Sequence, residues 1–382
     1  SYPPLQKDSR TEVAVIGGGL CGSSAAYHLA EQGIQVTLLE ARTIAESASG
    51  RNAGFLLQGT AERYNRAVSL LGRSKAQRIH AWSLENHHRI AAQIRKYGIQ
   101  CEYQKRGSLQ LAGSPEEETE LIQSAEMLNE DGFQAVFLKK AQLAEALQKA
   151  GFAMGVHLPE DGELHPSAFV RGVICSAQQK GAIIHEMSRV IEVDASTPGD
   201  VRIHTEEGSV RADLVILATN ARAGELFPIL HDKIDPVRGQ MLATAPQEEI
   251  FDCPIYANHG YDYWRQDKSG RVILGGWRNL DPEGEIGHEE KVIPHIQHSM
   301  QEFLKQMDVK APVVHQWAGI MGFSRDGMPL VGPIPGSAGA LSGVGFTGHG
   351  FGFAFLAGHA LATQVIEGQH PFSMEFDPRR FL

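Results

Sequence analysis

The sequence predicts a mixed α/β protein in which one domain is built on a parallel sheet and a second domain is rich in β-strands. Three observations predict this fold class. Residues 13–40 read as a strand, a glycine-rich turn, a helix and a second strand. Residues 234–324 contain alternating stretches that are rich in aromatic and β-branched residues, as antiparallel strands are. A second glycine-rich stretch, at 343–352, leads into an apolar helix at about 353–366.

The first stretch is a βαβ unit by its pattern. The apolar run 13–16 is typical of a buried parallel strand, and three glycines at 17–19 end it. A helical pattern follows from 21 to about 32, and a second strand over 35–39 ends in Glu40. This order is that of a Rossmann-like dinucleotide-binding domain. The alternative is a plain βαβ unit with a glycine-rich turn.

Each glycine of this unit has a physical purpose in such a domain. Gly17 permits the sharp turn out of the strand, Gly19 leaves room for a pyrophosphate, and Gly22 allows close packing of the helix on the sheet. Free N–H groups at the helix start attract phosphate. Glu40 stands where a carboxylate accepts hydrogen bonds from a ribose diol. An acid there disfavours a 2′-phosphate, so the sequence favours FAD or NAD over NADP.

The residues after Glu40 predict a wall beside the bound group. Small residues are dense over 47–54, and Arg51 and Asn52 stand among them. Such a run lets the backbone pass close to something flat or bulky. An ordinary polar loop is the alternative.

Composition excludes several classes of protein. The net charge of −10 comes without a long block of like charge, which argues against nucleic acid or an anionic membrane surface as the main partner. The four cysteines are far apart and have no metal-site spacing, so we expect a reduced, cytoplasmic protein without a metal site. The N-terminus lacks the apolar core of a signal peptide, and no run approaches the length of a membrane helix.

The order of the elements predicts two domains. A buried strand at 214–217 would return the chain to the first sheet, and the helical stretch at about 80–150 resembles an insertion. We therefore expect a discontinuous nucleotide-binding domain and a substrate-binding domain. The first would comprise 1–80, 151–225 and 325–382, and the second 81–150 and 226–324.

Further motifs cover nearly the whole chain. They are GGGLCG at 17–22, ASGRNAGF at 48–55, GELHPSAFV at 162–170, ADLVILATNA at 212–221, PVRGQ at 236–240, WAGIMGFSRDGMPLVG at 317–332 and GFTGHG at 345–350. Together they resemble the D-amino-acid oxidase superfamily, in the branch with glycine oxidase, sarcosine oxidase and γ-glutamylputrescine oxidase. The first motif is common to many FAD and NAD proteins, whereas its combination with the later ones is far more specific.

The resemblance implies bound FAD. Sarcosine oxidases attach flavin through a cysteine near the segment that corresponds to 319–322, which holds no cysteine here, so we expect noncovalent FAD. The residues implied in FAD binding are Gly17, Gly18, Gly19, Leu20, Cys21, Gly22, Glu40, Ala41, Arg42, Ala48, Ser49, Arg51, Asn52, Ala53, Gly54, Val190, Ala218, Thr219, Gly345, Phe346, Thr347, Gly348, His349 and Gly350.

The resemblance also implies the reaction. In this family a neutral amine binds, its α-hydrogen moves to flavin N5 as a hydride, and the imine hydrolyses in water. The candidates for contact with the substrate here are His349, Tyr263, Trp277 and Arg51. Tyr261 and Trp264 belong to the same aromatic set, and plain core packing is the alternative for at least half of these aromatic residues.

Departures from the family favour certain substrates. Glycine oxidase binds the substrate carboxylate with arginines at positions that correspond to Met321 and about Gly348. Their loss disfavours glycine and simple D-amino acids and favours a secondary amine, or a substituted amine on a longer molecule. Possible anion partners that remain are Arg51, Arg265, Arg278 and Arg325, each of which could instead form a structural ion pair.

The electron acceptor stays open between oxygen and another carrier. Sarcosine oxidase has a lysine near flavin N5 that assists oxygen, and Ile273 stands at the corresponding position here. This favours a dehydrogenase that passes electrons to a quinone or carrier protein. The same scaffold could also serve a tRNA-modifying or C–C-bond enzyme, or a non-catalytic flavin-binding subunit of a hetero-oligomer. The absence of a basic stripe argues against the tRNA enzyme.

Overall fold

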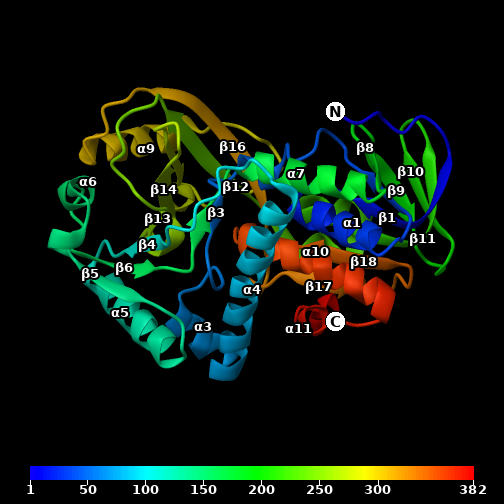
Figure 1. The fold of residues 1–382 in the computed structure, drawn as a ribbon, viewed down its shortest axis with the longest axis horizontal. Helices are drawn as coiled ribbons and strands as arrows, with labels where there is room; N and C mark the ends of the chain where they lie inside the picture. Colours follow the sequence, from blue (N-terminus) through cyan, green and yellow to red (C-terminus); the bar gives the residue numbers. More distant parts are fainter.

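The computed structural model describes all 382 residues, which fold around two large sheets that lie side by side (Figure 1). The first has the strand order β17-β18-β11-β1-β2-β8. Its parallel strands are β1 (Ser9–Ile16), β2 (Val36–Leu39), β8 (Ile183–His185), β11 (Ser209–Leu217) and β18 (Ala340–Val344). The antiparallel ones are β17 (Leu330–Pro333), β9 (Val190–Asp194) and β10 (Val201–Thr205). The parallel sheet is as predicted.

The helices α1 (Leu20–Glu31), α7 (Pro166–Gln179) and α10 (Gly350–Glu367) pack together on the first sheet (Figure 1). α10 crosses α1 closely, since a Cβ on Gly358 would lie 2.5 Å from the carbonyl oxygen of Cys21. The hydroxyl of Ser24 donates a hydrogen bond of 2.6 Å to the carbonyl of Phe355. The two helices that begin in glycine-rich turns are therefore held side by side.

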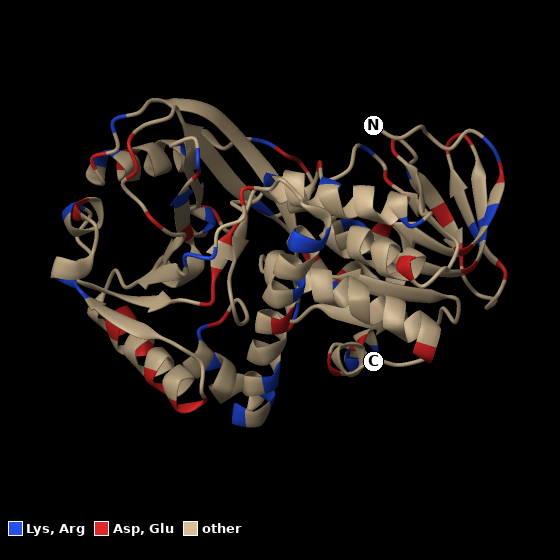
Figure 2. Cartoon of the chain, viewed as in Figure 1, with Lys and Arg blue, Asp and Glu red and all other residues tan.

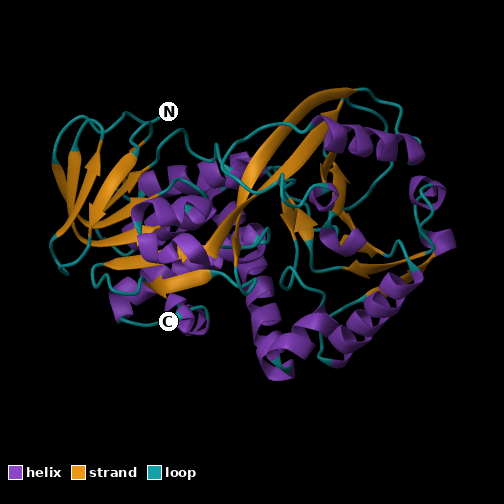
Figure 3. Cartoon of the chain, turned by 180° about the vertical axis from the view of Figure 1, so that it is seen from behind, coloured by secondary structure: helices purple, strands orange, loops and turns teal.

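The second sheet is long and mostly antiparallel, with the order β16-β12-β15-β14-β13-β4-β6-β5. Its strands are β4 (Ser108–Leu111), β5 (Val136–Lys139), β6 (Met154–Leu158), β12 (Ile234–Thr244), β13 (Ile255–Ala257), β14 (Asp262–Gln266), β15 (Val272–Gly276) and β16 (Val313–Ser324). α9 (Pro294–Gln306) buries Ile296 and Met300 against its core. Seen from behind, the long strands of this sheet reach the helices of the first domain (Figure 3).

The remaining elements connect or cover these two sheets. They are α2 (Ala48–Arg51), β3 (Phe55–Leu56), α3 (Tyr64–Leu71), α5 (Pro115–Glu130), α6 (Glu145–Lys149), β7 (Gly162–Glu163), α8 (Ala223–Leu226), α11 (Pro371–Glu375) and the 3-10 helices Lys140–Gln142, Asn220–Arg222, Pro228–Lys233, Asn258–Gly260, Arg278–Leu280 and Pro378–Phe381. Acidic residues repeat along α5, whereas charges of both signs are spread over the rest of the view (Figure 2).

α4 (Arg73–Tyr97) lies between the two sheets, although most of it falls in the range expected for the substrate-binding domain. Its residues Ile79 and Ile90 are fully buried in the core of the first domain. The side chain of Asn86 donates to the carbonyl of Phe351 at 2.7 Å and accepts from the N–H of Leu356 at 2.9 Å. We therefore propose that the domain division follows the two sheets, with α4 attached to the first.

Two helical predictions differ from the structure. The pattern over 61–97 predicts one helical stretch, but Gly72, with a φ of +80°, separates α3 from α4. The sequence pattern over about 140–149 also predicts one helix, but the structure has the short 3-10 helix Lys140–Gln142 there, followed by α6. In both cases periodicity continues through a break that the backbone makes, because apolar spacing reports a buried face and not the dihedral angles of each residue.

Candidate active site

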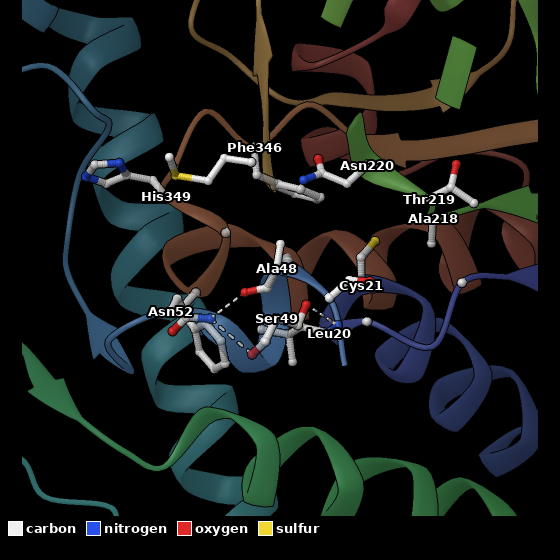
Figure 4. A pocket seen from close by; sticks show the side chains of 18 of the residues that line it. Leu20, Cys21, Ala48, Ser49, Asn52, Ala218, Thr219, Asn220, Phe346 and His349 are labelled. Atoms are coloured by element: carbon white, nitrogen blue, oxygen red, sulfur yellow. Dashed lines mark hydrogen bonds between the residues drawn. The ribbon is translucent and has the colours of Figure 1, made fainter. Parts of the chain in front are cut away.

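A cavity of about 410 Å³ lies between the two sheets. The first domain contributes the turn after β1, the end of β2, α2, the end of β11 and the start of α10. The second domain contributes a wall that consists of Tyr256, His259, Gly260, Tyr263, Arg278, Met321 and Phe323. Figure 4 shows how α1, α2, the end of β11 and the loop before α10 converge on this pocket.

The glycine-rich turn after β1 is packed as tightly as the sequence predicts. Gly17 has a φ of +112°, and a Cβ there would lie 2.6 Å from the carbonyl oxygen of Ala218. A Cβ on Gly22 would lie 2.0 Å from the carbonyl oxygen of Gly17. The N–H of Leu20 donates to the hydroxyl of Ser49 at 3.0 Å. The pocket floor is thus bare backbone at the positive end of α1, which suits a phosphate.

Glu40 closes this turn from the end of β2. Its carboxylate accepts hydrogen bonds from the N–H of Gly18 at 2.7 Å and from the N–H of Arg42 at 2.8 Å. Burial raises the pKa of Glu40, and these two hydrogen bonds oppose that rise. Because each carboxylate oxygen has further lone pairs, Glu40 can still accept from a hydroxyl in the pocket.

Within the run of small residues at 47–54, the short helix α2 covers Ala48–Arg51, and the residues after it are irregular. A Cβ on Gly50 would lie 1.9 Å from the carbonyl oxygen of Ala45, so only glycine fits there. The amide of Asn52 donates to the carbonyl oxygens of Ala48 and Ser49 and accepts from the N–H of Gly54 (Figure 4). Asn52 therefore fixes the backbone of this wall.

Asn220 is a pocket residue that none of the sequence motifs predicts as a site residue. It follows β11 with a φ of +48°, and its side-chain oxygen accepts from the N–H of Gly345 at 2.9 Å. The N–H of Thr347 donates to the carbonyl of Gly322 at 2.8 Å. These bonds attach the loop before α10 to both sheets. An asparagine after a buried strand is a turn signal, because asparagine tolerates the left-handed conformation.

His349 is the residue before α10 and lines the pocket. Its Nδ1 is buried without a hydrogen-bond partner in the chain, and its ring lies 6.2 Å from that of Tyr256. Burial, with a smaller contribution from the charge of Arg278, lowers its pKa to about 4. The imidazole is therefore neutral near pH 7, with one ring nitrogen free to bond a ligand.

Aromatic side chains form much of the second-domain wall. The rings of Tyr256 and Tyr263 lie 6.2 Å apart, and Phe55 from the first domain lies 6.0 Å from Tyr263. Burial raises the pKa of Tyr263 to about 12, so its phenol stays protonated. Its hydroxyl donates a weak hydrogen bond of 3.5 Å to the sulfur of Met241, a partner that a stronger acceptor on a ligand can replace.

Four arginines line the pocket, and three of them form ion pairs within the chain. Arg42 pairs with Glu290, and Arg189 and Arg222 both pair with Glu225. Arg278 has no carboxylate within ion-pair distance. Its guanidinium lies over the rings of Tyr261 at 4.3 Å and Phe323 at 5.3 Å. Arg278 is therefore the cation of this pocket that is open to an anionic ligand.

The pocket brings together most of the residues predicted to bind the cofactor. Those that line it are Gly17, Gly19, Leu20, Cys21, Glu40, Ala41, Arg42, Ala48, Ser49, Asn52, Ala53, Val190, Ala218, Thr219, Phe346, Thr347, Gly348, His349 and Gly350. Those that lie behind this lining are Gly18, Gly22, Arg51, Gly54 and Gly345. These five residues support the lining by close packing and by the hydrogen bonds described above.

Two of the four predicted substrate-contact residues, Trp277 and Arg51, do not line the pocket. Trp277 is 9% exposed and packs on Phe303 of α9 at 5.1 Å, because its φ of +58° turns it into the second core. Arg51 pairs with Glu290 at 3.2 Å. These two residues therefore lie outside the lining, whereas Tyr263 and His349 lie in it, and contact of any of the four with the substrate stays a prediction.

Of the other positions discussed in the sequence analysis, some line the pocket and others lie elsewhere. Arg265 pairs with Glu163 in a buried site, and Arg325 pairs with Asp232 on the surface. Ile273, at the position that corresponds to the oxygen-assisting lysine, does not line the pocket, and neither does any lysine. Met321 and Gly348 do line it, at the positions where glycine oxidase has arginines.

A glycine-rich turn at a helix start, an acid at the end of β2 and a cavity closed by a second sheet are the arrangement of a dinucleotide-dependent oxidoreductase. Residues 12–364 match the model of the DAO family, described as FAD dependent oxidoreductase, and the chain belongs to this family. It is an enzyme of the amine- and amino-acid-oxidising class with FAD as its cofactor. The predicted family, fold class and cofactor are confirmed.

Named relatives cover nearly the whole chain. The probable oxidoreductase OrdL of Haemophilus influenzae is 29% identical over 96% of this chain and 85% of its own length. Gamma-glutamylputrescine oxidoreductase of Escherichia coli is 27% identical over 94% and 84%. The crystal structure of L-proline dehydrogenase from P. horikoshii has a TM-score of 0.80 at 22% identity and covers 98% of each chain, which shows a shared fold.

The residues present fit FAD. The bare backbone at the start of α1 suits the pyrophosphate, Glu40 suits the ribose, and the start of α10 supplies a second set of N–H groups. No helix of the chain has both the length and the apolar character needed to cross a membrane.

Proposed function

We propose that this enzyme oxidises the C–N bond of an N-substituted amino acid, with noncovalent FAD as the hydride acceptor and hydrolysis of the imine in water. The observation that carries the proposal is the unpaired guanidinium of Arg278 in the second-domain wall. An arginine without a carboxylate partner is suited to bind the carboxylate of a substrate. This restricts the broader class of amines to those that carry an acid.

The other side chains of this wall support binding of an uncharged amine. The second domain contributes no acid to the pocket lining, so no carboxylate there pairs with an ammonium group. His349 is neutral near pH 7 and has a free ring nitrogen. The protonated phenol of Tyr263 can donate to the substrate carboxylate beside Arg278. These groups orient the substrate, and no strong side-chain base is required.

The wall also leaves room for a substituent on the nitrogen. A Cβ on Gly348 would reach ordinary van der Waals contact with Met321 Sδ at 3.6 Å and Phe323 at 3.7 Å, and glycine leaves this space to a ligand. A relative named for γ-glutamylputrescine supports a longer amine substrate that carries a carboxylate. Cys21 is the cysteine of the pocket lining, and burial raises its pKa to about 12, which supports noncovalent flavin.

The test is anaerobic bleaching of the flavin by matched pairs of compounds. Sarcosine and N-substituted amino acids should bleach the flavin band, whereas the corresponding amides, which lack the carboxylate, should not. Arg278→Gln should raise the half-saturating concentration of the acids by about 10- to 100-fold, because a charge-assisted hydrogen bond contributes about 1.5–3 kcal/mol. Its FAD content should match the wild type. Equal bleaching by acids and amides would contradict the proposal.

A second candidate keeps this half-reaction and changes the acceptor. The lack of a lysine in the pocket lining favours a dehydrogenase that passes electrons to a quinone or carrier protein. After bleaching, slow return of the flavin colour in air would indicate this dehydrogenase. Fast return with one peroxide per turnover would indicate an oxidase.

A further inference from the structure

Glu290 joins the second domain to two arginines beside the cofactor pocket. It lies in the connection between the 3-10 helix Arg278–Leu280 and α9. Its carboxylate accepts from both terminal nitrogens of Arg42, at 2.9 and 3.0 Å, and lies 3.2 Å from Nη2 of Arg51. The side chain is 18% exposed, so these pairs are partly shielded from solvent.

The backbone around Glu290 is held firmly on β12. The buried side chain of Arg238 donates to the carbonyls of Gly284 and Glu289 at 2.8 and 2.6 Å. The amide of Gln240 donates to the carbonyl of Lys291 at 3.1 Å. Because the residues on both sides of Glu290 are fixed to a long strand, its carboxylate is a rigid attachment point and not a mobile surface group.

Each arginine belongs to a segment that forms the cofactor pocket. The N–H of Arg42 donates to Glu40, and Arg42 itself lines the pocket. Arg51 ends α2, and its side chain also donates to the carbonyls of Glu46 and Ala318. The indole of Trp317 donates to the carbonyl of Arg51 at 2.9 Å. One carboxylate of the second domain therefore holds the end of β2 and α2 together.

We propose that Glu290 is a positioning residue that slows the release of FAD. With the carboxylate in place, segments 40–42 and 48–51 stay against the second domain and close the pocket over the bound cofactor. Without it, Glu46, whose Oε1 lies 3.6 Å from Nη1 of Arg42, is the remaining carboxylate beside the two guanidinium groups. Arg42 then has no ion pair to the second domain, and one carboxylate faces two cations, which loosens the contact between the segments and that domain. The proposal requires FAD binding by this chain and does not depend on the identity of the substrate.

The test compares Glu290→Gln with its neighbour Glu289→Gln. The side chain of Glu289 is 75% exposed and pairs with Lys291 at 3.0 Å, so it is a matched control. After dilution of the holoenzyme, the rise of free flavin fluorescence gives the FAD release rate. We expect release about 10-fold faster or more in Glu290→Gln, from the loss of charge-assisted hydrogen bonds. In Glu289→Gln the rate should stay within about twofold of the wild type.

A second measurement distinguishes a direct effect of the Glu290 ion pairs on FAD release from a general effect of Glu290 on stability. Release from the wild type should become faster with rising salt, because salt screens the pairs of Glu290, whereas release from Glu290→Gln should depend less on salt. Glu290→Asp, which keeps the charge but shortens its reach, should have an intermediate release rate and serves if the Gln variant fails to fold. If Glu290→Gln and Glu290→Asp both released FAD at the wild-type rate and with the wild-type salt dependence, the proposal would be overturned.

Discussion

The carboxylate of Glu40 accepts a 2.7 Å hydrogen bond from the backbone N–H of Gly18. The acid at the end of β2 is thus attached to the glycine-rich turn after β1, 22 residues away in the chain. The same side chain lines the pocket. One residue therefore fixes the shape of the turn and presents a carboxylate to the pocket, and the two effects can be measured separately.

Glu40→Gln should weaken FAD binding by about 10-fold or more, because a charged acceptor facing the ribose is lost. Titration of the apoprotein with FAD measures this effect. Binding as tight as in the wild type would show that Glu40 does not contact the cofactor.

The pH dependence of apoprotein stability tests the environment of Glu40. Burial raises its pKa, so the folded state binds its proton more tightly than the unfolded state. Its contribution to the free energy of unfolding therefore falls as pH rises from about 4.3 through the folded pKa. The difference in stability between the wild type and Glu40→Gln should shrink over this window. Urea unfolding at several pH values measures it, and a difference that grows would contradict the burial.

Gly22→Ala should destabilise the protein by more than about 2 kcal/mol and abolish FAD binding, because its Cβ would meet the backbone oxygen of Gly17 at 2.0 Å. Gly113→Ala is the control, since its nearest neighbour would be Glu117 at 3.6 Å. Thermal unfolding of both variants gives the comparison. A stable Gly22→Ala that binds FAD would mean that α1 is free to move away from the turn.

Asn220→Ala should lower the free energy of unfolding by about 2 kcal/mol, because it leaves the N–H of Gly345 unpaired and keeps a left-handed residue that is not glycine. Asn220→Gly should lower it less, since glycine relieves the dihedral strain. The visible circular dichroism of the bound flavin should likewise change more in Asn220→Ala than in Asn220→Gly. Equal losses in the two variants would assign the whole effect to the hydrogen bond.

His80 should make the protein sensitive to acid. It is 3% exposed, and burial lowers its pKa to about 3. Between about pH 6.5 and the folded pKa the unfolded state takes up a proton that the folded state does not, so stability falls as pH falls. At pH 5 the loss is about 2 kcal/mol from this residue. His80→Gln should reduce the difference between unfolding at pH 7.5 and pH 5, and the exposed His88→Gln should not.

Local pattern predicted the nucleotide-binding half of this protein. The strand at 13–16, the turn at Gly17 and the acid at Glu40 are close in sequence, and each obeys a rule that concerns its neighbours alone. Their positions in the structure agree with the prediction. Ser49 and Thr347 are also placed by motif, since small residues and glycines mark the backbone that passes a ligand.

The second-domain wall of the pocket could not be predicted in the same way, because its composition depends on contacts between segments that are far apart in the sequence. Trp277 and Arg278 are neighbours, yet a left-handed turn sends the tryptophan into the core and leaves the arginine in the pocket. Whether an arginine is paired depends on segments far apart in the chain, as Arg42 and Glu290 show across 248 residues. The sequence by itself therefore determined the cofactor class through local backbone chemistry. The tertiary structure decided which cation of the pocket remains without an ion pair, because only folding brings each arginine to its counter-charge or keeps it apart.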